Sequence, residues 1–566
     1  MSELLKIVSS QYKHIPGRKG DVIDGRTITE ASTLKNEPFS FQALYRAEGG
    51  EFCHAVSISA VTELPARAWK VGYVAVEHTA ASQSGKEYES REPGLFPDLL
   101  SPRPAKPEII EVKTAWARNF YFEKDVDATL NASDDDFQAV WFTINPDSLE
   151  LKADKYEIRI VLTSLITNQP LDEARLTLNI IDASLPKQDF YYTNWFHVDC
   201  LCDAFDVKPY SNKFYRIFDK FIENMTAHRQ NTLLLPAFTP ALDTAIGEER
   251  MNVQLAEIER TEDGWSFGFE KMRRFVRHAK KCGVEIFEHC HLFSQWGAKN
   301  TPNVYDKDGR RIFGFDTDAA GEEYVSFIRA YLKAFLAFAK EEGIEKNVIF
   351  HISDEPTEKQ IEGYRAAHDA VFDLLGGNPI CDAMFDCSFH EAGLVDQPII
   401  HVDHLKTYDE NTHPPIWLYY TGGGKNTSNR KISNTAAATR VIGLHMYKYK
   451  ALGFLHWAYN FYYDRLSFGF CDPRTSVNAY KHFPGITHLC YPASEGCGFV
   501  APSIREKLMG EAMDDLRALR LLESKIGREA TLALCEESLG EINAYTVPEG
   551  EALRELRELI NKKIAE

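Results

Sequence analysis

Apolar and polar residues alternate with a period of two in the N-terminal part of the chain. The two clearest runs carry apolar side chains at every second position: Tyr156, Ile158 and Ile160, then Leu176, Leu178 and Ile180. This period places successive side chains on opposite faces of a β-strand. Turn-rich pieces separate these short runs, which is typical of a β-sandwich. We therefore predict an all-β sandwich domain over residues 1–187, with its boundary at Pro186 and Lys187.

From residue 188 onward, short apolar runs alternate with amphipathic helical stretches. Eight runs are predicted as strands: residues 194–200 (NWFHVDC), then NTLLLPAF, VEIFEHCH, NVIFHISDEP, PICDAMFD, PIIHVDH, PIWLYY and GFLHWAYN. Their number and their alternation with helices predict a central (β/α)8 TIM-type barrel over residues 188–500. The connection between HVDH and PIWLYY shows no helix, so the barrel is expected to be irregular there. An open doubly wound sheet would usually carry a glycine-rich phosphate loop after its first strand, and none follows here.

The helical stretches have recognisable apolar stripes and stop signals. One predicted helix has six apolar residues on one face: Phe214, Ile217, Phe218, Phe221, Ile222 and Met225. Two later helices are expected to end at Gly283 and Gly343, because glycine readily terminates helices. Residues 501–566 have apolar positions at helical spacing, which predicts C-terminal helices that pack on the barrel.

The composition is that of a globular protein, and it narrows the range of partners. Of 566 residues, 44% are hydrophobic and 26% are charged, and the formal net charge is −19. This acidic balance, with no basic stripe, argues against nucleic acid as a partner. No apolar stretch approaches the roughly 20 residues of a membrane span, so no membrane insertion is expected. The first residues lack a secretory apolar core, and the 11 scattered cysteines fit reduced thiols, so we expect a cytoplasmic location.

The strongest chemical signal is a pair of adjacent acids, Asp354 and Glu355, in the segment HISDEPTEKQ. The apolar residues 348–350 before them predict a buried strand, and the active sites of barrels lie at the carboxyl ends of such strands. Thr357 and Gln360 then form a capping box that begins the next helix. If these residues alone are considered, favourable charge near that helix N-terminus explains the acids equally well.

Aromatic and polar residues near the predicted strand ends are candidates for substrate binding. The full set is Trp195, His291, Trp296, Asp386, His404, Tyr419, Trp457 and Asn460. Trp457 is predicted to form a floor beneath a sugar ring, and packing inside the barrel is the competing explanation for each aromatic residue. The segment 422–430 contains three consecutive glycines and is a candidate lid, which carries Lys425, Asn426 and Arg430.

Histidines at strand ends leave a metal-dependent alternative open. His289 and His291 are spaced H-x-H, which places both rings on one face of a strand, and His401 and His404 end a later strand. Converging on one ion, they would form a metal-dependent TIM-barrel hydrolase. Amide hydrolases usually carry H-x-H on the first strand, whereas here it lies on the third, so we predict no metal and no cofactor. A non-catalytic carbohydrate-binding protein is the remaining alternative, and the intact acid pair argues against it.

Three segments resemble glycoside hydrolase family 123 and the uncharacterised domains related to it. They are S-D-E-P, GFLHWAYN near the last strand, and PSIREKLMGEAMDDLRALRLLE, which is similar to the closing helix of the family. The N-terminal sandwich that ends in Leu-Pro also resembles the family, and together these features cover most of residues 150–525. One departure is Tyr462, where the family often has tryptophan two residues after the Asn of HWAYN, so the contacts to the aglycone stay open.

The resemblance implies a retaining glycoside hydrolase that releases terminal β-linked N-acetylgalactosamine from an oligosaccharide or glycoconjugate. It implies a substrate-assisted mechanism, in which the 2-acetamido oxygen attacks the anomeric carbon. Glu355 would then be the general acid/base, and Asp354 would orient the acetamido group and stabilise its nitrogen. Tyr419 would donate a hydrogen bond to the acetamido oxygen. Adjacent acids suit this chemistry, because side chains of consecutive residues diverge and reach different atoms of one sugar. The galacto rather than gluco configuration follows from the resemblance alone.

Overall fold

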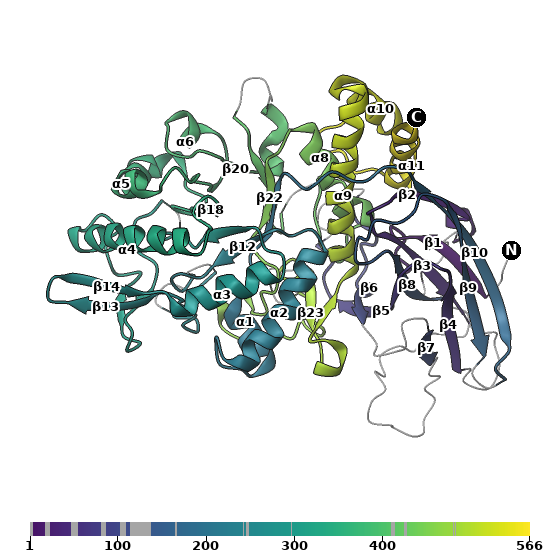
Figure 1. Ribbon diagram of the computed structural model, residues 1–566, viewed down its shortest axis with the longest axis horizontal. Helices are drawn as coiled ribbons and strands as arrows, with labels where there is room; N and C mark the ends of the chain where they lie inside the picture. Colours follow the sequence, from purple (N-terminus) through teal and green to yellow (C-terminus); the bar gives the residue numbers. More distant parts are fainter. Residues whose placement is uncertain are drawn as a thin grey trace.

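The computed structural model has a β-rich N-terminal part, a central part with parallel strands, and C-terminal helices (Figure 1). It describes residues 4–566 apart from 17, 19–22, 47–54, 81–86, 102–108, 114–136, 165–166, 241–242, 245–247, 296, 409–413, 424–426, 479 and 481–482.

Two five-stranded sheets pack face to face in the N-terminal part. The first has the order β1 (Leu5–Ser9), β3 (Phe39–Tyr45), β8 (Gln138–Ile144), β5 (Ala66–Val76) and β6 (Gly94–Ser101). The second has the order β2 (Glu30–Leu34), β10 (Pro170–Ile181), β9 (Lys155–Ser164), β4 (Ala55–Val61) and β7 (Ile109–Lys113). Neighbours are antiparallel except β10 and β2, which are parallel. Ile158 and Leu178 lie in the core between the sheets, so the period of two indicated the buried face correctly.

The described residues of the central part form eight parallel strands in two sheets. One sheet has the order β12 (Thr232–Leu235), β15 (Ile286–His289) and β18 (Val348–Ile349). The other has the order β11 (Tyr191–Asn194), β22 (Gly453–His456), β21 (Trp417–Tyr419), β20 (Ile399–His401) and β19 (Ala383–Met384). Between β18 and β19 a single parallel bridge pairs Phe350 with Ile380. The described strands therefore form two parallel sheets instead of the one continuous barrel ladder that the sequence predicted.

The first predicted strand of the central part is wrong in its extent. The predicted strand covered residues 194–200, but strand β11 ends at Asn194. Helix α1 (Val198–Phe205) begins within the predicted segment and continues beyond it. Residues 198–202 are all buried, and a short apolar run fits a buried helix as well as a buried strand. Helix α1 therefore begins inside the segment that was predicted as a strand.

Helices follow most of the central strands and end near the predicted glycines. Gly283 and Gly343 have φ values of 100° and 65° just beyond two of these helices, so the predicted helix ends are confirmed. The helices are α2 (Asn212–Ala227), α3 (Glu270–Lys281), α4 (Glu322–Glu341), α5 (Ile361–Val371), α6 (Ser388–Glu391), α7 (Ala436–Arg440) and α8 (Ile442–Lys448). Three hairpins complete this part: β13 (Glu257–Thr261) with β14 (Gly264–Gly268), β16 (Val304–Tyr305) with β17 (Arg311–Phe313), and β23 (Cys490–Pro492) with β24 (Val500–Pro502).

The C-terminal helices contact both other parts of the protein. They are α9 (Ile504–Ile526), α10 (Arg528–Leu539) and α11 (Ala552–Ala565). Helix α9 packs against α7 and α8 of the central part and against β6 of the sandwich, and α11 packs against β2. Figure 1 shows α9 running between the two larger parts. The sequence predicted contact with the central domain and gave no sign of the contact with the sandwich.

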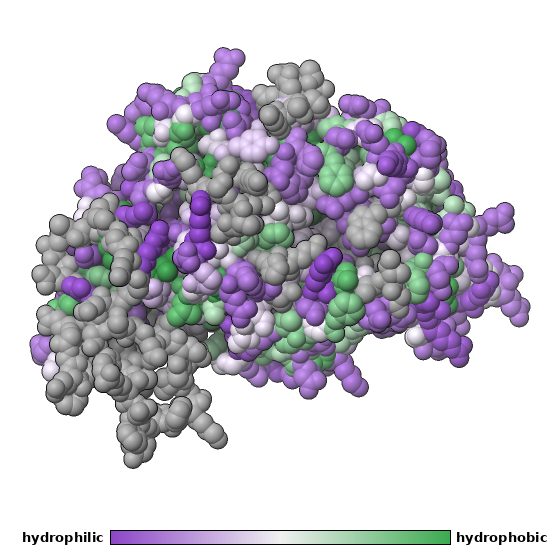
Figure 2. All heavy atoms as spheres, turned by 180° about the vertical axis from the view of Figure 1, so that it is seen from behind, coloured by the Kyte–Doolittle hydropathy of each residue, from purple (hydrophilic) through white to green (hydrophobic). Residues whose placement is uncertain are grey.

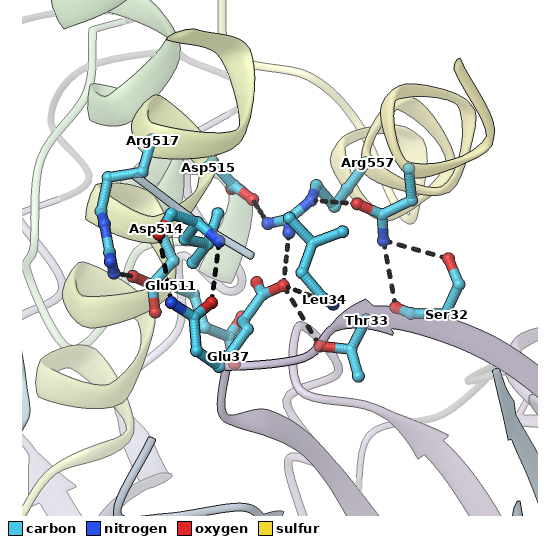
Figure 3. A network of polar contacts seen from close by, with 12 residues as sticks. Ser32, Thr33, Leu34, Glu37, Glu511, Asp514, Asp515, Arg517 and Arg557 are labelled. Atoms are coloured by element: carbon cyan, nitrogen blue, oxygen red, sulfur yellow. Dashed lines mark hydrogen bonds and ion pairs between the residues drawn. The ribbon is translucent and has the colours of Figure 1, made fainter. Parts of the chain in front are cut away.

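Charged side chains fix this junction (Figure 3). Glu37, beside β2, accepts a hydrogen bond from the guanidinium of Arg557 on α11 and another from Thr33 at 3.1 Å. The same Arg557 also donates to Asp515 on α9 at 2.9 Å, and Asp515 accepts two hydrogen bonds from Arg440 of α7. One network of ion pairs therefore joins sandwich, central part and C-terminal helices.

Where its residues are described, the face opposite to the view of Figure 1 carries mainly hydrophilic residues, with apolar residues in smaller areas between them (Figure 2). None of the helices in the part of the chain that the structure describes has the length and hydropathy needed to cross a bilayer.

Candidate active site

Asp354 and Glu355 lie just beyond the carboxyl end of β18, and both side chains are partly exposed. The backbone N–H of Glu355 donates to the carbonyl of Ala383 on β19 at 3.0 Å, which ties the pair to the second sheet. Glu355 has a φ of 42°, in the left-handed region. This conformation costs a residue other than glycine roughly 1–2 kcal/mol. Strained backbone of this kind is concentrated at functional sites, where the surroundings fix it.

Ser353 clamps the loop that presents Gln295 to Asp354. The Ser353 hydroxyl donates to the carbonyl of Ser294 at 2.8 Å and accepts the backbone N–H of Gly297 at 3.1 Å. Between these two residues, Gln295 Nε2 donates to Asp354 Oδ2 at 3.0 Å. The serine of S-D-E-P thus positions a partner of the neighbouring aspartate.

The surroundings of Asp354 make it a weak acid. Burial raises the pKa of Asp354 to about 7, the Glu355 carboxylate adds to the rise, and the hydrogen bond from Gln295 opposes it. Two neighbouring carboxyls titrate as a pair, because the first negative charge disfavours the second. Below about pH 7 Asp354 therefore retains its proton.

Tyr419 holds the other acid from strand β21. Its hydroxyl donates to Glu355 Oε1 at 2.7 Å, and the ring is 3% exposed. Burial raises the pKa of Tyr419, and the Glu355 and Asp354 carboxylates raise it further, so the phenol stays protonated. The structure thus directs the Tyr419 donor at Glu355, whereas the sequence prediction directed it at the substrate.

The buried side chain of His351 lies between two carboxylates. Nε2 is 3.1 Å from Glu288 Oε2, and Nδ1 is 3.3 Å from Asp382 Oδ1. Burial lowers the pKa of His351, but these carboxylates outweigh burial and raise it to about 10. His351 is therefore a cation at neutral pH, and its charge favours the ionised form of Asp354.

Both carboxylates have further partners that fix the strand ends. Trp195 Nε1 donates to Glu288 Oε2 at 2.8 Å, and the indole is only 2% exposed. Asp382 Oδ2 accepts the backbone N–H groups of Ile352 at 3.0 Å and Ser353 at 3.2 Å. Trp195 therefore supports the site from within the core, and Asp382 shapes the backbone that leads to the acid pair.

His291 is a neighbour of His351 and is partly exposed. Its ring stacks on His351 with centroids 4.9 Å apart and meets Trp195 edge-on at 5.4 Å. Burial lowers the pKa of His291 well below its usual value, and the neighbouring His351 lowers it further. A neutral imidazole in this place can accept or donate one hydrogen bond to a substrate.

Trp457 and Tyr480 form an aromatic wall near the acids. Trp457 is partly exposed, and its ring centroid is 5.1 Å from those of Tyr480 and Phe461. The Tyr480 hydroxyl donates to Asp243 Oδ1 at 3.2 Å. Burial and then Asp243 raise the pKa of Tyr480, and the Glu355 carboxylate adds to the rise.

Several predicted site residues are engaged elsewhere. Asn460 is fully buried, and its amide accepts from the backbone N–H of His197 at 2.8 Å and donates to the His197 carbonyl at 3.0 Å. Asp386 is exposed and accepts the backbone N–H of Ser388 at 2.9 Å. Trp296 lies outside the described residues. Asn460 thus joins two strand ends, where the sequence predicted contact with a sugar.

The candidate lid is anchored on its C-terminal side. Residues 427–430 are buried, and the guanidinium of Arg430 is 2.7 Å from His456 Nδ1 inside the core. Lys425 and Asn426 lie outside the described residues. Arg430 therefore packs inside the protein, whereas the sequence placed it in a candidate lid.

The four histidines of the metal-dependent alternative do not form one cluster. His289 points into the core, where its Nε2 is 2.9 Å from the Tyr331 hydroxyl and its Nδ1 is 2.6 Å from the Cys290 carbonyl. His401 and His404 have ring centroids 6.1 Å apart at another strand end, and His404 is exposed.

A different group, His291, His351 and Asp382, presents potential ligand atoms within 4.8 Å of one another. In this group His351 uses both ring nitrogens for ion pairs with Glu288 and Asp382. A metal would have to displace these pairs, so the donors fit an ion-paired network better than a ligand set.

Sequence reasoning missed the residues that surround the pair, notably Gln295, Glu288, His351 and Asp382. A signal was present for three of them. Glu288, His351 and Asp382 are polar residues inside apolar strand runs, and buried charges of this kind require partners. Gln295 lies in a loop and carried no comparable signal.

Cleavage of glycosidic bonds by enzymes usually relies on carboxyls held in different protonation states. A carboxyl pair at the carboxyl ends of parallel strands is an arrangement that glycoside hydrolases use. The family model described as "Glycoside hydrolase 123, catalytic domain" matches residues 195–522, which is more than half of the chain. The chain belongs to this family and is a glycoside hydrolase.

One solved structure agrees with the fold of this family. A family 123 glycoside hydrolase from Clostridium perfringens, reported in a study of glycolipid glycan hydrolysis, aligns with a TM-score of 0.71 and 12% identity. The alignment covers 99% of this chain and 97% of that chain. β-Glucuronidase 2 of Bacteroides uniformis aligns with a TM-score of 0.30 and 9% identity over 87% of this chain and 48% of that chain. A search of the curated proteins finds no match.

Proposed function

We propose that this glycoside hydrolase removes terminal β-linked N-acetylgalactosamine from an oligosaccharide or glycoconjugate, with net retention and by substrate-assisted catalysis. One observation carries the proposal. Adjacent acids at a strand end have separate anchors, Gln295 on Asp354 and Tyr419 on Glu355, so that each can act on a different atom of one sugar. The fold shared with a family 123 enzyme studied for glycolipid glycan hydrolysis supports the substrate class.

Asp354 and Glu355 divide the work on the 2-acetamido sugar. The acetamido N–H donates to Asp354, which must be ionised to accept it, so on substrate binding the proton of Asp354 passes to Glu355. The acetamido oxygen attacks the anomeric carbon, the glycosidic bond breaks, and Glu355 donates its proton to the departing oxygen. Water then adds to the anomeric carbon of the oxazolinium ring, and Glu355 takes the proton of that water. The second displacement restores the original configuration.

The proposal extends to the architecture of the central part and to the cellular compartment. We propose that the two parallel sheets are two arcs of one (β/α)8 barrel, with Trp457 as the floor of its sugar site; the bridge between Phe350 and Ile380 supports this closure. We also propose that the domains span residues 1–187, 188–500 and 501–566. The described cysteines are free thiols, which supports a reducing compartment such as the cytoplasm.

The test is hydrolysis of the 4-nitrophenyl β-N-acetylgalactosaminide by Glu355→Gln and Asp354→Asn. Loss of the general acid should lower kcat by about 10²- to 10⁴-fold, and loss of the Asp354 charge should lower it to a similar extent. Glu358→Gln is the matched control, because Glu358 is an exposed acid three residues beyond the pair and should leave the rate unchanged. Wild-type rates in both pair variants would refute the assignment.

Two further measurements separate the mechanisms and the epimers. A thiazoline analogue of the cyclic intermediate should inhibit strongly if the acetamido group is the nucleophile. Comparison of the galacto and gluco thiazolines, and of the two matching 4-nitrophenyl glycosides, decides the configuration of the sugar. A metal-dependent hydrolase would instead lose activity with a chelator and be indifferent to both thiazolines.

A further inference from the structure

Phe385 lies two residues beyond the point at which Glu355 is tied to strand β19. It directly follows β19, whose Ala383 carbonyl accepts the backbone N–H of Glu355 at 3.0 Å. In the parallel ladder Met384 pairs with Ile400. The next residues along, Phe385 and His401, therefore lie at the same level of the sheet.

The same level continues on the next strand. His401 pairs with Tyr419, and the two rings meet edge-on with centroids 4.9 Å apart. Tyr419 in turn donates to Glu355 Oε1. Phe385, His401 and Tyr419 thus form a row across three neighbouring strand ends, and this row ends at the proposed acid.

Phe385 is a large apolar residue that the fold leaves uncovered. Its side chain is 39% exposed. Its ring centroid is 5.5 Å from that of the exposed His404, with the ring planes inclined by 64°, so that the two side chains form a corner. A ring in such a corner offers an apolar face, and the imidazole beside it offers nitrogen atoms to a hydroxyl group.

We propose that Phe385 and His404 form the subsite for the sugar that is released, the neutral pyranose linked to N-acetylgalactosamine. This inference rests on the proposed function. Glu355 protonates the bridging oxygen, so the departing sugar must lie beyond Glu355, and the row from Tyr419 to Phe385 extends from that carboxyl. The C–H face of a pyranose packs on the Phe385 ring, and His404 meets a hydroxyl at its edge.

The test compares two ligands of different reach on Phe385→Ala. A thiazoline of N-acetylgalactosamine fills the site of the cleaved sugar alone, and a β-N-acetylgalactosaminyl-galactose disaccharide fills both subsites. We expect kcat/KM for the disaccharide to fall about two- to tenfold, the range for loss of one aromatic contact, with an unchanged inhibition constant for the thiazoline. Phe385→Tyr should restore most of the loss, because it retains the ring.

Phe372→Ala is the matched control. Phe372 is 54% exposed and stacks on a histidine, His368, with centroids 4.7 Å apart, but it follows the C-terminal end of α5, away from the strand ends of the site. It should change neither constant. An unchanged kcat/KM in Phe385→Ala, or an equal loss of thiazoline affinity, would overturn the subsite. Failure of the proposed function would be separate, since the wild-type enzyme would then neither cleave the disaccharide nor bind the thiazoline.

Discussion

At the scale of residues, the adjacency of Asp354 and Glu355 defines what the site can do. Each acid has one side-chain donor of its own, Gln295 and Tyr419, so the two carboxyls are held apart although their residues are consecutive. Burial and mutual repulsion make the pair retain a proton to about pH 7. A site with one proton and one charge can protonate a leaving group and stabilise a cationic intermediate in the same step.

This shared proton predicts the pH dependence of the reaction. The active form has one proton on the pair, and the pKa of about 7 for Asp354 means that this proton is lost as the pH rises through that value. We expect kcat/KM for the 4-nitrophenyl glycoside to fall about tenfold per pH unit above neutrality. Initial rates between pH 5 and pH 9 check this, and a rate that stays constant from pH 6 to pH 9 would contradict it.

At the scale of elements, the strand ends of β15, β18 and β19 act as one charged unit. Glu288 lies on β15, and Asp382 directly precedes β19. His351, which follows β18, lies between their carboxylates. Such a buried arrangement is stable only when each charge keeps its partner. It also supplies a positive charge near Asp354.

Removal of the His351 charge should move the pH profile. In His351→Gln the amide can keep hydrogen bonds but is neutral, so the pair loses a cation that favours its ionised form, and the pKa of Asp354 rises. We expect the alkaline limb of kcat/KM to shift to higher pH by about one unit or less. His368→Gln is the control, since His368 is buried on α5 beside Asp369 and away from the pair. A variant that loses activity equally at every pH would show that His351 acts on structure alone.

At the scale of the whole molecule, the segment that resembles the closing helix of the family is a joint between domains. Ser503 caps α9 by accepting the backbone N–H of Glu506 at 3.0 Å. Arg505 makes two hydrogen bonds of 2.9 Å to Asp98 on β6 of the sandwich, and both side chains are fully buried. Asp514 and Asp515 of the same helix hold arginines from the central part, Arg229 and Arg440. The residues of this motif therefore join the parts of the protein, and none of them is one of the two acids.

Breaking this joint should destabilise the whole protein. Arg505→Met leaves the Asp98 carboxylate buried without its cation, which costs about 3–5 kcal/mol in comparable sites. On the same helix, Arg520→Met removes an exposed ion pair with Asp189 and should cost about 1 kcal/mol or less. Urea unfolding followed by tryptophan fluorescence measures both. Equal effects of the two substitutions would show that the Asp98–Arg505 pair has no special place in the joint.

Local patterns in the sequence determined the elements and the position of the acids. The period of two located the core of β9 and β10, the glycines at 283 and 343 ended helices, and the apolar run before Asp354 located a strand end. These features depend on neighbours within one turn or one strand, so they can be recognised from the sequence alone. Residues 198–202 show the limit of this method, because a short buried run is compatible with helix and strand alike.

Tertiary structure decided which side chains meet. His351 lies 63 residues from Glu288, and Tyr419 lies 64 residues from Glu355, and no periodicity specifies such contacts. The same holds for Asn460, which was predicted to contact the substrate, and for Arg430, which was placed in a candidate lid. The fold uses both to satisfy buried backbone and side-chain groups. The sequence by itself thus determined where the chemistry is located along the chain. The packing of distant strands decided the charge and orientation of each group, because burial and long-range partners set both.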